Sequence, residues 1–171
     1  MLSFRNFNYQ LLFDNDDRFK KLTYNIKKDK TNNNYGCFLP KKIKNNEHII
    51  SFIDKNNVVC SFIWFGIYSE NKINVLKAVN KISEISEISE ISEISEIKKN
   101  EKYIYINFSY TFEAYRNIGL NKKLRLWIES YCLTNKINYI ISVPLPDSSS
   151  SIVLNKLNYD KKDNYYIKKI F

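Results

Sequence analysis

The spacing of apolar and polar residues divides this chain into strand-like and helix-like segments. Residues 4–9 alternate as a strand does, and apolar residues between 11 and 26 recur on roughly one face of a helix. Residues 49–53 and 58–68 are rich in β-branched and aromatic residues, and the short polar stretch between them is typical of a β-hairpin. Residues 27–35 are polar and predict a loop.

The second half of the chain carries the clearer pattern. Residues 103–111 (YIYINFSYT) predict a strand. Residues 119–134 predict a helix with one apolar face, and Arg125 and Glu129 fall off that face. A strand over 139–143 is ended by two prolines, and a short helix follows over 148–157. With strands beginning at Tyr159 and at Tyr165, the order of elements predicts an α/β fold with a mixed sheet.

Five perfect copies of Ile-Ser-Glu fill residues 82–96. In a helix, a period of three turns each isoleucine by about 60° from the last, so the isoleucines form no stable apolar stripe. We therefore predict a low-complexity insertion in a surface loop over about 69–100, since long loops are tolerated thermodynamically. The 171 residues otherwise predict a single domain, 1–171.

Several classes of protein are excluded by composition. The longest mostly apolar stretch, residues 58–68, is shorter than the roughly 20 residues that cross a bilayer, and no secretory signal is visible at the N-terminus. Three widely separated cysteines and a single histidine predict neither a zinc site nor a disulfide framework. We expect a soluble, cytoplasmic protein without a metal.

The chain carries 27 basic and 18 acidic residues, a formal net charge of +9. Only four of the basic residues are arginine, and the lysines are spread along the chain, which argues for a basic surface composition over a nucleic-acid interface. A basic nucleic-acid-binding module is kept as an alternative. Its affinity would fall steeply as salt is added.

The junction between the strand at 103–111 and the helix at 119–134 carries an unusual charge pattern. Arg116 stands in the loop, and Lys122 and Lys123 stand in the first helical turn, where the helix dipole is already positive. An anion such as a phosphate or pyrophosphate would neutralise this potential. Gly119 lets the backbone approach such an anion without an intervening Cβ.

Arg116-x-x-Gly119-x-Asn121, after a strand and opening a helix, resembles the cofactor motif Gln/Arg-x-x-Gly-x-Gly/Ala of the GNAT superfamily of acetyl-CoA-dependent N-acetyltransferases. Residues 151–159 resemble the A-x-x-L-Y-x-K-L-G-F segment of that family. The resemblance is clearest over residues 102–171. It implies a GNAT-like, mostly antiparallel central sheet flanked by helices, and an acetyltransferase that uses acetyl-CoA and an amine acceptor.

The resemblance also implies roles for particular residues. Backbone groups around Thr111 would pair with the pantetheine arm, and Asp147 stands where many members contact that arm. Backbone N–H groups of the turn, helped by the Arg116 side chain, would hold the pyrophosphate. The cofactor-binding residues implied are therefore Thr111, Arg116, Asn117, Ile118, Gly119, Leu120, Asn121, Lys122 and Asp147.

The sequence departs from the family at the catalytic positions. The tyrosine that commonly protonates the leaving thiolate maps to Leu154, and a glutamate base found in some members maps to Tyr105. Tyr105, Tyr110 and Tyr159 are candidate substitutes as acid or water-positioning groups. A degenerate member that binds CoA or a partner without transfer is therefore the second hypothesis, and neither the acceptor nor the oligomeric state is predicted.

Overall fold

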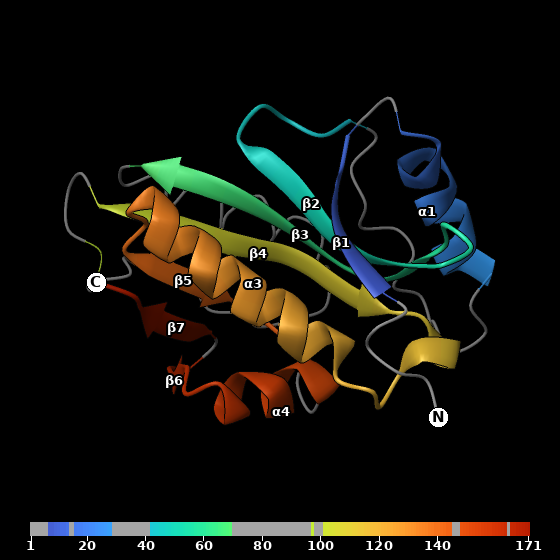
Figure 1. Ribbon diagram of the computed structural model, residues 1–171. Coiled ribbons are helices and arrows are strands. Elements are labelled where there is room, and N and C mark those ends of the chain that lie inside the picture. Colours follow the sequence, from blue (N-terminus) through green and yellow to red (C-terminus); the bar gives the residue numbers. More distant parts are fainter. Residues whose placement is uncertain are drawn as a thin grey trace, which may run out of the picture.

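The computed structural model of the protein describes residues 7–13, 16–28, 42–69, 97, 101–144, 148–163 and 165–171. Figure 1 shows the elements in chain order, which are β1 (Phe7–Leu12), α1 (Asp17–Lys28), β2 (Glu47–Asp54), β3 (Val59–Ser69), β4 (Lys102–Thr111), the 3-10 helix η3 (Glu113–Tyr115), α3 (Leu120–Asn135), β5 (Tyr139–Ser142), α4 (Ser149–Lys156), β6 (Asp160–Lys161) and β7 (Tyr166–Lys169).

The strands of the described residues form one seven-stranded sheet in the order β1-β2-β3-β4-β5-β7-β6. β4 and β5 pair in parallel, and the other neighbouring pairs are antiparallel. Because parallel neighbours need a crossover, α3 carries the chain from the end of β4 back to the start of β5. The mixed, mostly antiparallel sheet predicted from the sequence is confirmed.

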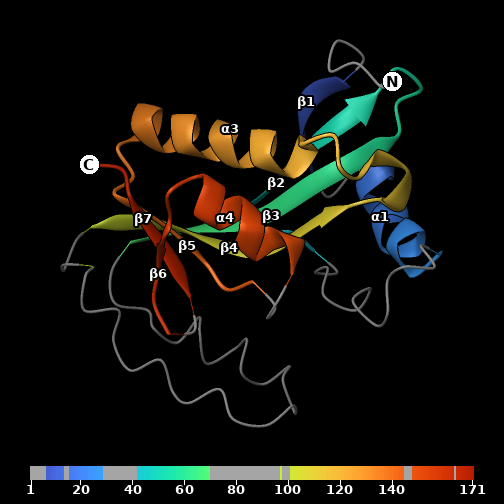
Figure 2. The ribbon, with the colours of Figure 1, turned by 90° about the horizontal axis from the view of Figure 1, so that it is seen from below.

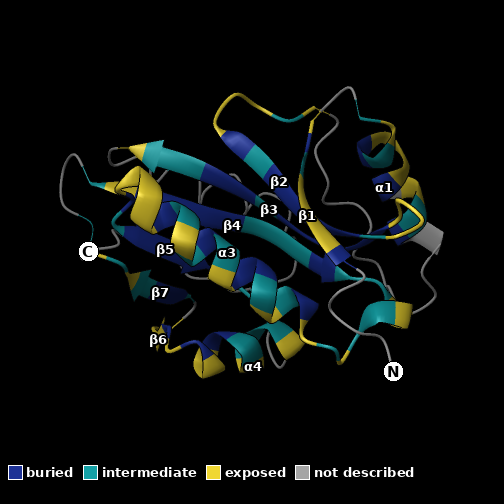
Figure 3. Ribbon diagram, in the orientation of Figure 1, coloured by how far each residue is buried: buried dark blue, intermediate teal, exposed yellow. Residues whose placement is uncertain are grey.

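Helices cover both faces of the sheet. α3 and α4 lie on one face, and α1 lies on the other (Figures 1 and 2). The alternation of side chains along β2 divides the core accordingly, since Ile50 packs on the α3 side and its neighbour Ile49 packs on the α1 side. Burial is therefore continuous along the central strands, whereas α3 keeps an exposed outer side (Figure 3).

The N-terminal helix begins later than the periodicity predicts. Leu11 and Leu12 belong to β1, where they pair with Ile50 and Ile49 of β2, so the prediction of a helix from residue 11 was wrong. The helix begins only after Asp16, whose carboxylate accepts a hydrogen bond of 2.8 Å from the backbone N–H of Arg18. Pairing with β2 outweighed a helical spacing that five apolar residues suggested by chance.

The repeat at 82–96 and nearly all of the predicted insertion lie outside the described residues. The strands that flank it, β3 and β4, are antiparallel neighbours, and Ser69 pairs directly with Lys102. The intervening segment therefore leaves and re-enters the sheet at adjacent points, at the end of one hairpin. In the described part of the chain, no helix is both long and apolar enough to cross a membrane.

Candidate functional site

The parallel ladder between β4 and β5 stops partway along β4. Its last pair joins Ile106 to Ser142, whereas β4 continues to Thr111. Beyond Ser142 the chain turns away through Val143 and Pro144 towards α4. The two central strands thus separate, and an extended ligand could lie along β4 as an added strand would.

A β-bulge lies at the point where the strands separate. Trp64 of β3 pairs with Phe108, and the next residue, Phe65, pairs with Ile106, so Asn107 is the extra residue of β4. A bulge bends its strand and increases the local twist. This bend carries the second half of β4 away from β5 and leaves a pocket between them.

The connection from β4 to α3 passes through two left-handed residues. Asn117 has a φ of 61°, and Gly119 has a φ of 82°. Only glycine, asparagine and aspartate adopt this region readily, so the sequence suits the turn at both positions. The side chains of Ile118 and Leu120 pack into the core under α3, which fixes the turn while its backbone lies outside.

The N-cap residue of α3 forms no side-chain hydrogen bond to the helix N-terminus. Gly119 occupies that position and has no side chain to accept from the first N–H groups. No acidic residue lies in the first turn, which holds Lys122 and Lys123 instead. The structure thus brings the predicted residues 117–122 into one turn whose electrostatics suit an anion.

Arg116, which is predicted to contact a phosphate, forms hydrogen bonds to the end of β4 in the structure. Arg116 Nε donates to the Thr111 carbonyl over 3.0 Å, and Nη2 lies 3.3 Å from the Tyr110 hydroxyl. The Thr111 hydroxyl in turn lies 2.8 Å from the hydroxyl of Ser61 on β3. Arg116 therefore fastens the turn to the end of β4, and the phosphate contact stays a prediction.

Tyr115 fixes the other side of the same turn. Its hydroxyl donates to Asp54 Oδ2 over 3.0 Å, across to the β2–β3 turn. Partial burial would raise the pKa of Asp54, but hydrogen bonds from the Val58 N–H, the Tyr115 hydroxyl and the Asn56 N–H outweigh it and lower that pKa below its usual value.

We expect Tyr115→Phe to raise the pKa of Asp54, because one donor to its ionised form is lost. A lowered carboxyl pKa contributes stability that is present above the unfolded-state value and is lost as pH falls through the folded-state value. The variant should therefore lose less stability than the wild type on acidification below about pH 4. A carbonyl NMR titration of Asp54 measures the shift, with Tyr131→Phe as the control. An unchanged Asp54 pKa in Tyr115→Phe would contradict this assignment.

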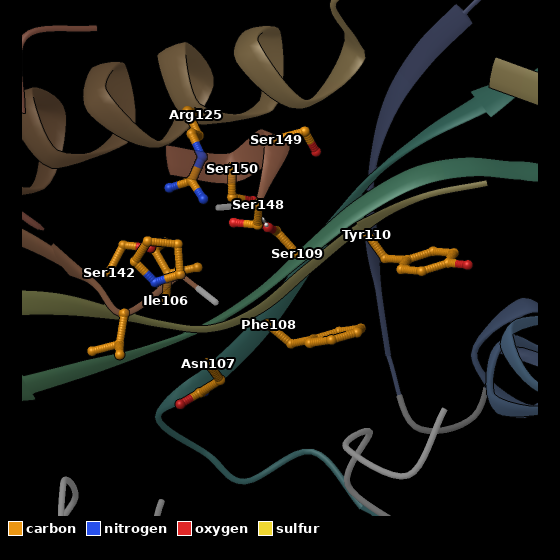
Figure 4. A pocket seen from close by; sticks show the side chains of 12 residues that line it. Ile106, Asn107, Phe108, Ser109, Tyr110, Arg125, Ser142, Ser148, Ser149 and Ser150 are labelled. Carbon is orange, nitrogen blue, oxygen red and sulfur yellow. Dashed lines mark hydrogen bonds between the residues drawn. The ribbon is translucent and has the colours of Figure 1, made fainter. Parts of the chain in front are cut away.

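A pocket of about 170 Å³ lies where β4 and β5 separate. Figure 4 shows Arg125 of α3 pointing into it, towards Ser109 of β4 and the serines at the start of α4, while Phe108 and Tyr110 point to the other side of β4. The Ser109 and Ser150 hydroxyls lie 3.3 Å apart. The side of the pocket facing α3 and α4 is therefore polar, although it lies over the apolar core.

Arg125 is the largest departure from the sequence analysis. The helical spacing placed it off the apolar face, but it is only 1% exposed. The reason is that α3 is covered on two sides, by the sheet and by α4, so a second stripe of the helix is buried. One signal was present in the sequence, because Asn121, Arg125 and Glu129 recur every four residues and so lie on one helix face.

Asn121 replaces the small residue expected at the end of the motif, and the structure shows what it contacts. Its Oδ1 accepts a hydrogen bond of 3.1 Å from Arg125 Nε, one helical turn further along α3. The asparagine side chain therefore follows the helix towards the pocket, and links the predicted phosphate-binding turn to Arg125.

The three candidate catalytic tyrosines lie apart from one another. Tyr105 is buried with Tyr68 and Tyr103 on the face opposite α3, and burial raises its pKa. Tyr110 stacks on Phe108 and contacts Arg116. Tyr159 is buried near Arg125, and burial raises its pKa as well. None of these observations assigns a role in catalysis.

Two further positions were singled out in the sequence. Leu154 of α4, at the position of the usual acid, is fully buried in the core under α3. Asp147, predicted to contact the pantetheine arm, lies outside the described residues. No group of three or more His, Cys, Asp or Glu side chains that could hold a metal occurs among the residues that the structure describes.

No protein-family model matches the sequence, and no curated protein matches it. Solved structures do match. Arylalkylamine N-acetyltransferase 2 of Aedes aegypti has a TM-score of 0.68 and 15% identity, covering 97% of this chain and 100% of that chain. NAA60 of Arabidopsis thaliana in complex with acetyl-CoA has a TM-score of 0.66 and 12% identity, covering 96% and 98%. The ribosomal-protein-alanine N-acetyltransferase of Brucella melitensis biovar Abortus 2308 has a TM-score of 0.59 and 10% identity, covering 92% and 94%.

The chain has the GNAT fold. This confirms the fold that the motif Arg116-x-x-Gly119-x-Asn121 predicted. At these identities the likeness concerns the arrangement of elements, and chemistry has to be argued from the site itself. In this GNAT fold the uncapped turn before α3 and the pocket beside β4 are neighbouring features, joined by Asn121 and Arg125.

Proposed function

We propose that the protein is an N-acetyltransferase that takes an acetyl group from acetyl-CoA and transfers it to an amine. One observation carries the proposal: the separation of β4 from β5 lies beside a basic, uncapped helix N-terminus reached through a left-handed turn. A donor with an extended arm and a pyrophosphate needs both features at once. The N-acetyltransferases among the structural neighbours, one of them in complex with acetyl-CoA, support the same donor.

The proposal assigns the parts of the donor to the turn and to the end of β4. The backbone N–H groups of residues 117–122 hold the pyrophosphate, and Lys122 adds a positive charge beside it. The backbone around Thr111 pairs with the pantetheine arm, with Arg116 keeping that strand end in position. The contact from Asp147 is proposed on the resemblance alone.

The reaction is a direct attack by a neutral amine on the thioester carbonyl. A C–N bond forms, the C–S bond breaks, the amine loses a proton and the thiolate takes one up. Among the tyrosines considered, Tyr110 contacts Arg116 beside the cofactor turn, but its ring points to the side of β4 away from the pocket, so the proposal names no proton donor.

A second function is supported by Leu154. This side chain carries no proton and is fully buried, so the usual source of the thiolate proton is absent at that position. A protein of this kind would bind acetyl-CoA, or a partner in its place, without transfer.

Thermal unfolding with and without acetyl-CoA tests the proposal first. A ligand at 100 times its dissociation constant adds about 2.7 kcal/mol of stability, which is a readily measured shift. The same protein is then assayed for transfer to a broad panel of protein, amino-sugar, amino-acid and other small amines. A shift of the melting temperature together with transfer supports the enzyme, and a shift without any transfer supports the CoA-binding protein. No shift contradicts both and leaves only the binding of a partner.

A further inference from the structure

Among the residues that the structure describes, Arg125 brings a cation into the interior without an ion pair of its own. Its Nε bonds to Asn121, but its Nη1 is buried and has no hydrogen-bond partner. The ion pairs formed by the described residues do not include Arg125. Burial lowers the pKa of this guanidinium, while Tyr159 and Glu129 raise it, and an arginine stays charged in proteins.

The charges of the described residues balance it only in part, because Glu129, whose Oε1 is buried without a hydrogen-bond partner, is shared with a second cation. Glu129 of α3 is paired with Lys168 of β7, whose Nζ lies 2.8 Å from Glu129 Oε2. Lys168 also donates to the Leu157 carbonyl over 2.8 Å, which holds it in place. The cluster of Arg125, Lys168 and Glu129 thus contains two cations and one carboxylate. A single negative charge in the pocket would complete it, and an uncompensated buried charge is costly.

The start of α4 offers further donors to the same space. Ser148 is the N-cap of α4, yet its side chain makes no capping bond and its Oγ is buried without a partner. The first turn contains no acidic residue among its three serines. Arg125 therefore points towards a helix N-terminus, and both favour a negative group (Figure 4).

The position of the pocket indicates which of the two substrates, the acyl donor or the amine, carries the negative group. It lies beside β4 at residues 106–110, on the side of the sheet covered by α3 and α4. The proposed pyrophosphate turn opens the same α3, and Asn121 connects that turn to Arg125. A donor whose arm runs from this turn along β4 would bring its acyl end to the pocket.

We propose that Arg125 and the serines at the start of α4 bind a carboxylate at the far end of the donor's acyl chain. The inference rests on the proposed function, and it adds the acyl class. The site takes short dicarboxylic acyl groups, such as malonyl or succinyl, in preference to neutral groups of equal length. In transfer, the C–S bond of this donor breaks and the C–N bond to the amine forms, so the product gains a carboxylate.

The test compares the dissociation constants of CoA, propionyl-CoA and malonyl-CoA, measured by calorimetry on the full chain. Malonyl and propionyl groups have equal carbon counts, so their ratio isolates the carboxylate. We expect wild-type protein to bind malonyl-CoA about tenfold more tightly than propionyl-CoA, as a charge-assisted hydrogen bond provides. In Arg125→Met the ratio should fall to about one, whereas Lys156→Met, which removes an exposed cation at the other end of α4, should keep it.

The outcomes separate this proposal from the one on which it rests. Binding of CoA with a wild-type ratio near one overturns the carboxylate subsite and leaves the proposed function standing. If Arg125→Met weakens the binding of CoA, propionyl-CoA and malonyl-CoA by the same factor, the carboxylate subsite is also overturned. Arg125 would then contact the pantetheine arm, which all three ligands share. No binding of CoA at all overturns both. The wild-type ratio needs no variant, so the test stands even where Arg125→Met does not fold.

Discussion

Gly119→Asp is expected to weaken the binding of acetyl-CoA by about a hundredfold while the protein stays folded. The turn at Gly119 combines a left-handed backbone with the uncapped, positive end of α3. A carboxylate at that point would occupy the place of the phosphate and repel it. Two charges 4 Å apart at an effective dielectric constant of 20 interact by about 4 kcal/mol, which is ample for the predicted loss.

Gly119→Asn is the matched control. Asparagine and aspartate have nearly the same shape, and both tolerate a positive φ, so the pair differs mainly in charge. Replacing glycine in the left-handed region costs at most about 1–2 kcal/mol, and the cost is nearly the same for the two side chains. Calorimetric titration of acetyl-CoA into both variants measures the difference. Equal losses would show that the site excludes bulk rather than charge, and full affinity in Gly119→Asp would falsify the phosphate assignment.

Arg125→Met is expected to stabilise the ligand-free protein by about 1 kcal/mol, because an unsatisfied buried donor costs about 1–3 kcal/mol. The guanidinium is fully buried and one of its nitrogens has no partner, so the folded state carries a desolvation cost that an apolar side chain of similar length avoids. The variant loses the hydrogen bond to Asn121, which is worth about 1 kcal/mol, and keeps the pair between Glu129 and Lys168.

Chemical denaturation measures this change, with Leu124→Met as the control. Leu124 precedes Arg125 on α3 and is equally buried, but it is apolar, so this substitution should cost less than about 1.5 kcal/mol. A loss of more than 1 kcal/mol in Arg125→Met would mean that the arginine supports the fold. A gain would fit a residue kept for binding at the expense of stability.

Local signals in the sequence were sufficient for much of the site. The aromatic and β-branched residues of 103–111 identified β4, and the periodic apolar residues after Gly119 identified α3. Gly119 and Lys122 mark a helix start without acidic residues, a property of neighbouring residues alone. Hence the strand, the turn and the helix were predictable, and with them the GNAT fold that the solved structures show.

Boundaries and burial depended on contacts between distant segments. Leu11 and Leu12 fit a helical spacing, yet pairing with β2 placed them in a strand. Tyr115 donates to Asp54, which lies 61 residues earlier in the chain and is brought near it only by the fold. No pattern of spacing predicts such pairings, because each partner lies outside the local window.

The sequence by itself determined that a basic, glycine-containing turn joins a central strand to an amphipathic helix, since propensity, periodicity and dipole effects act over a few residues. Only the tertiary structure decided that β4 and β5 separate after Ile106 and Ser142, and that α4 covers a second side of α3. The separation creates the pocket, and the second cover buries Arg125 within it. Both arise from packing between elements, which one segment cannot encode alone.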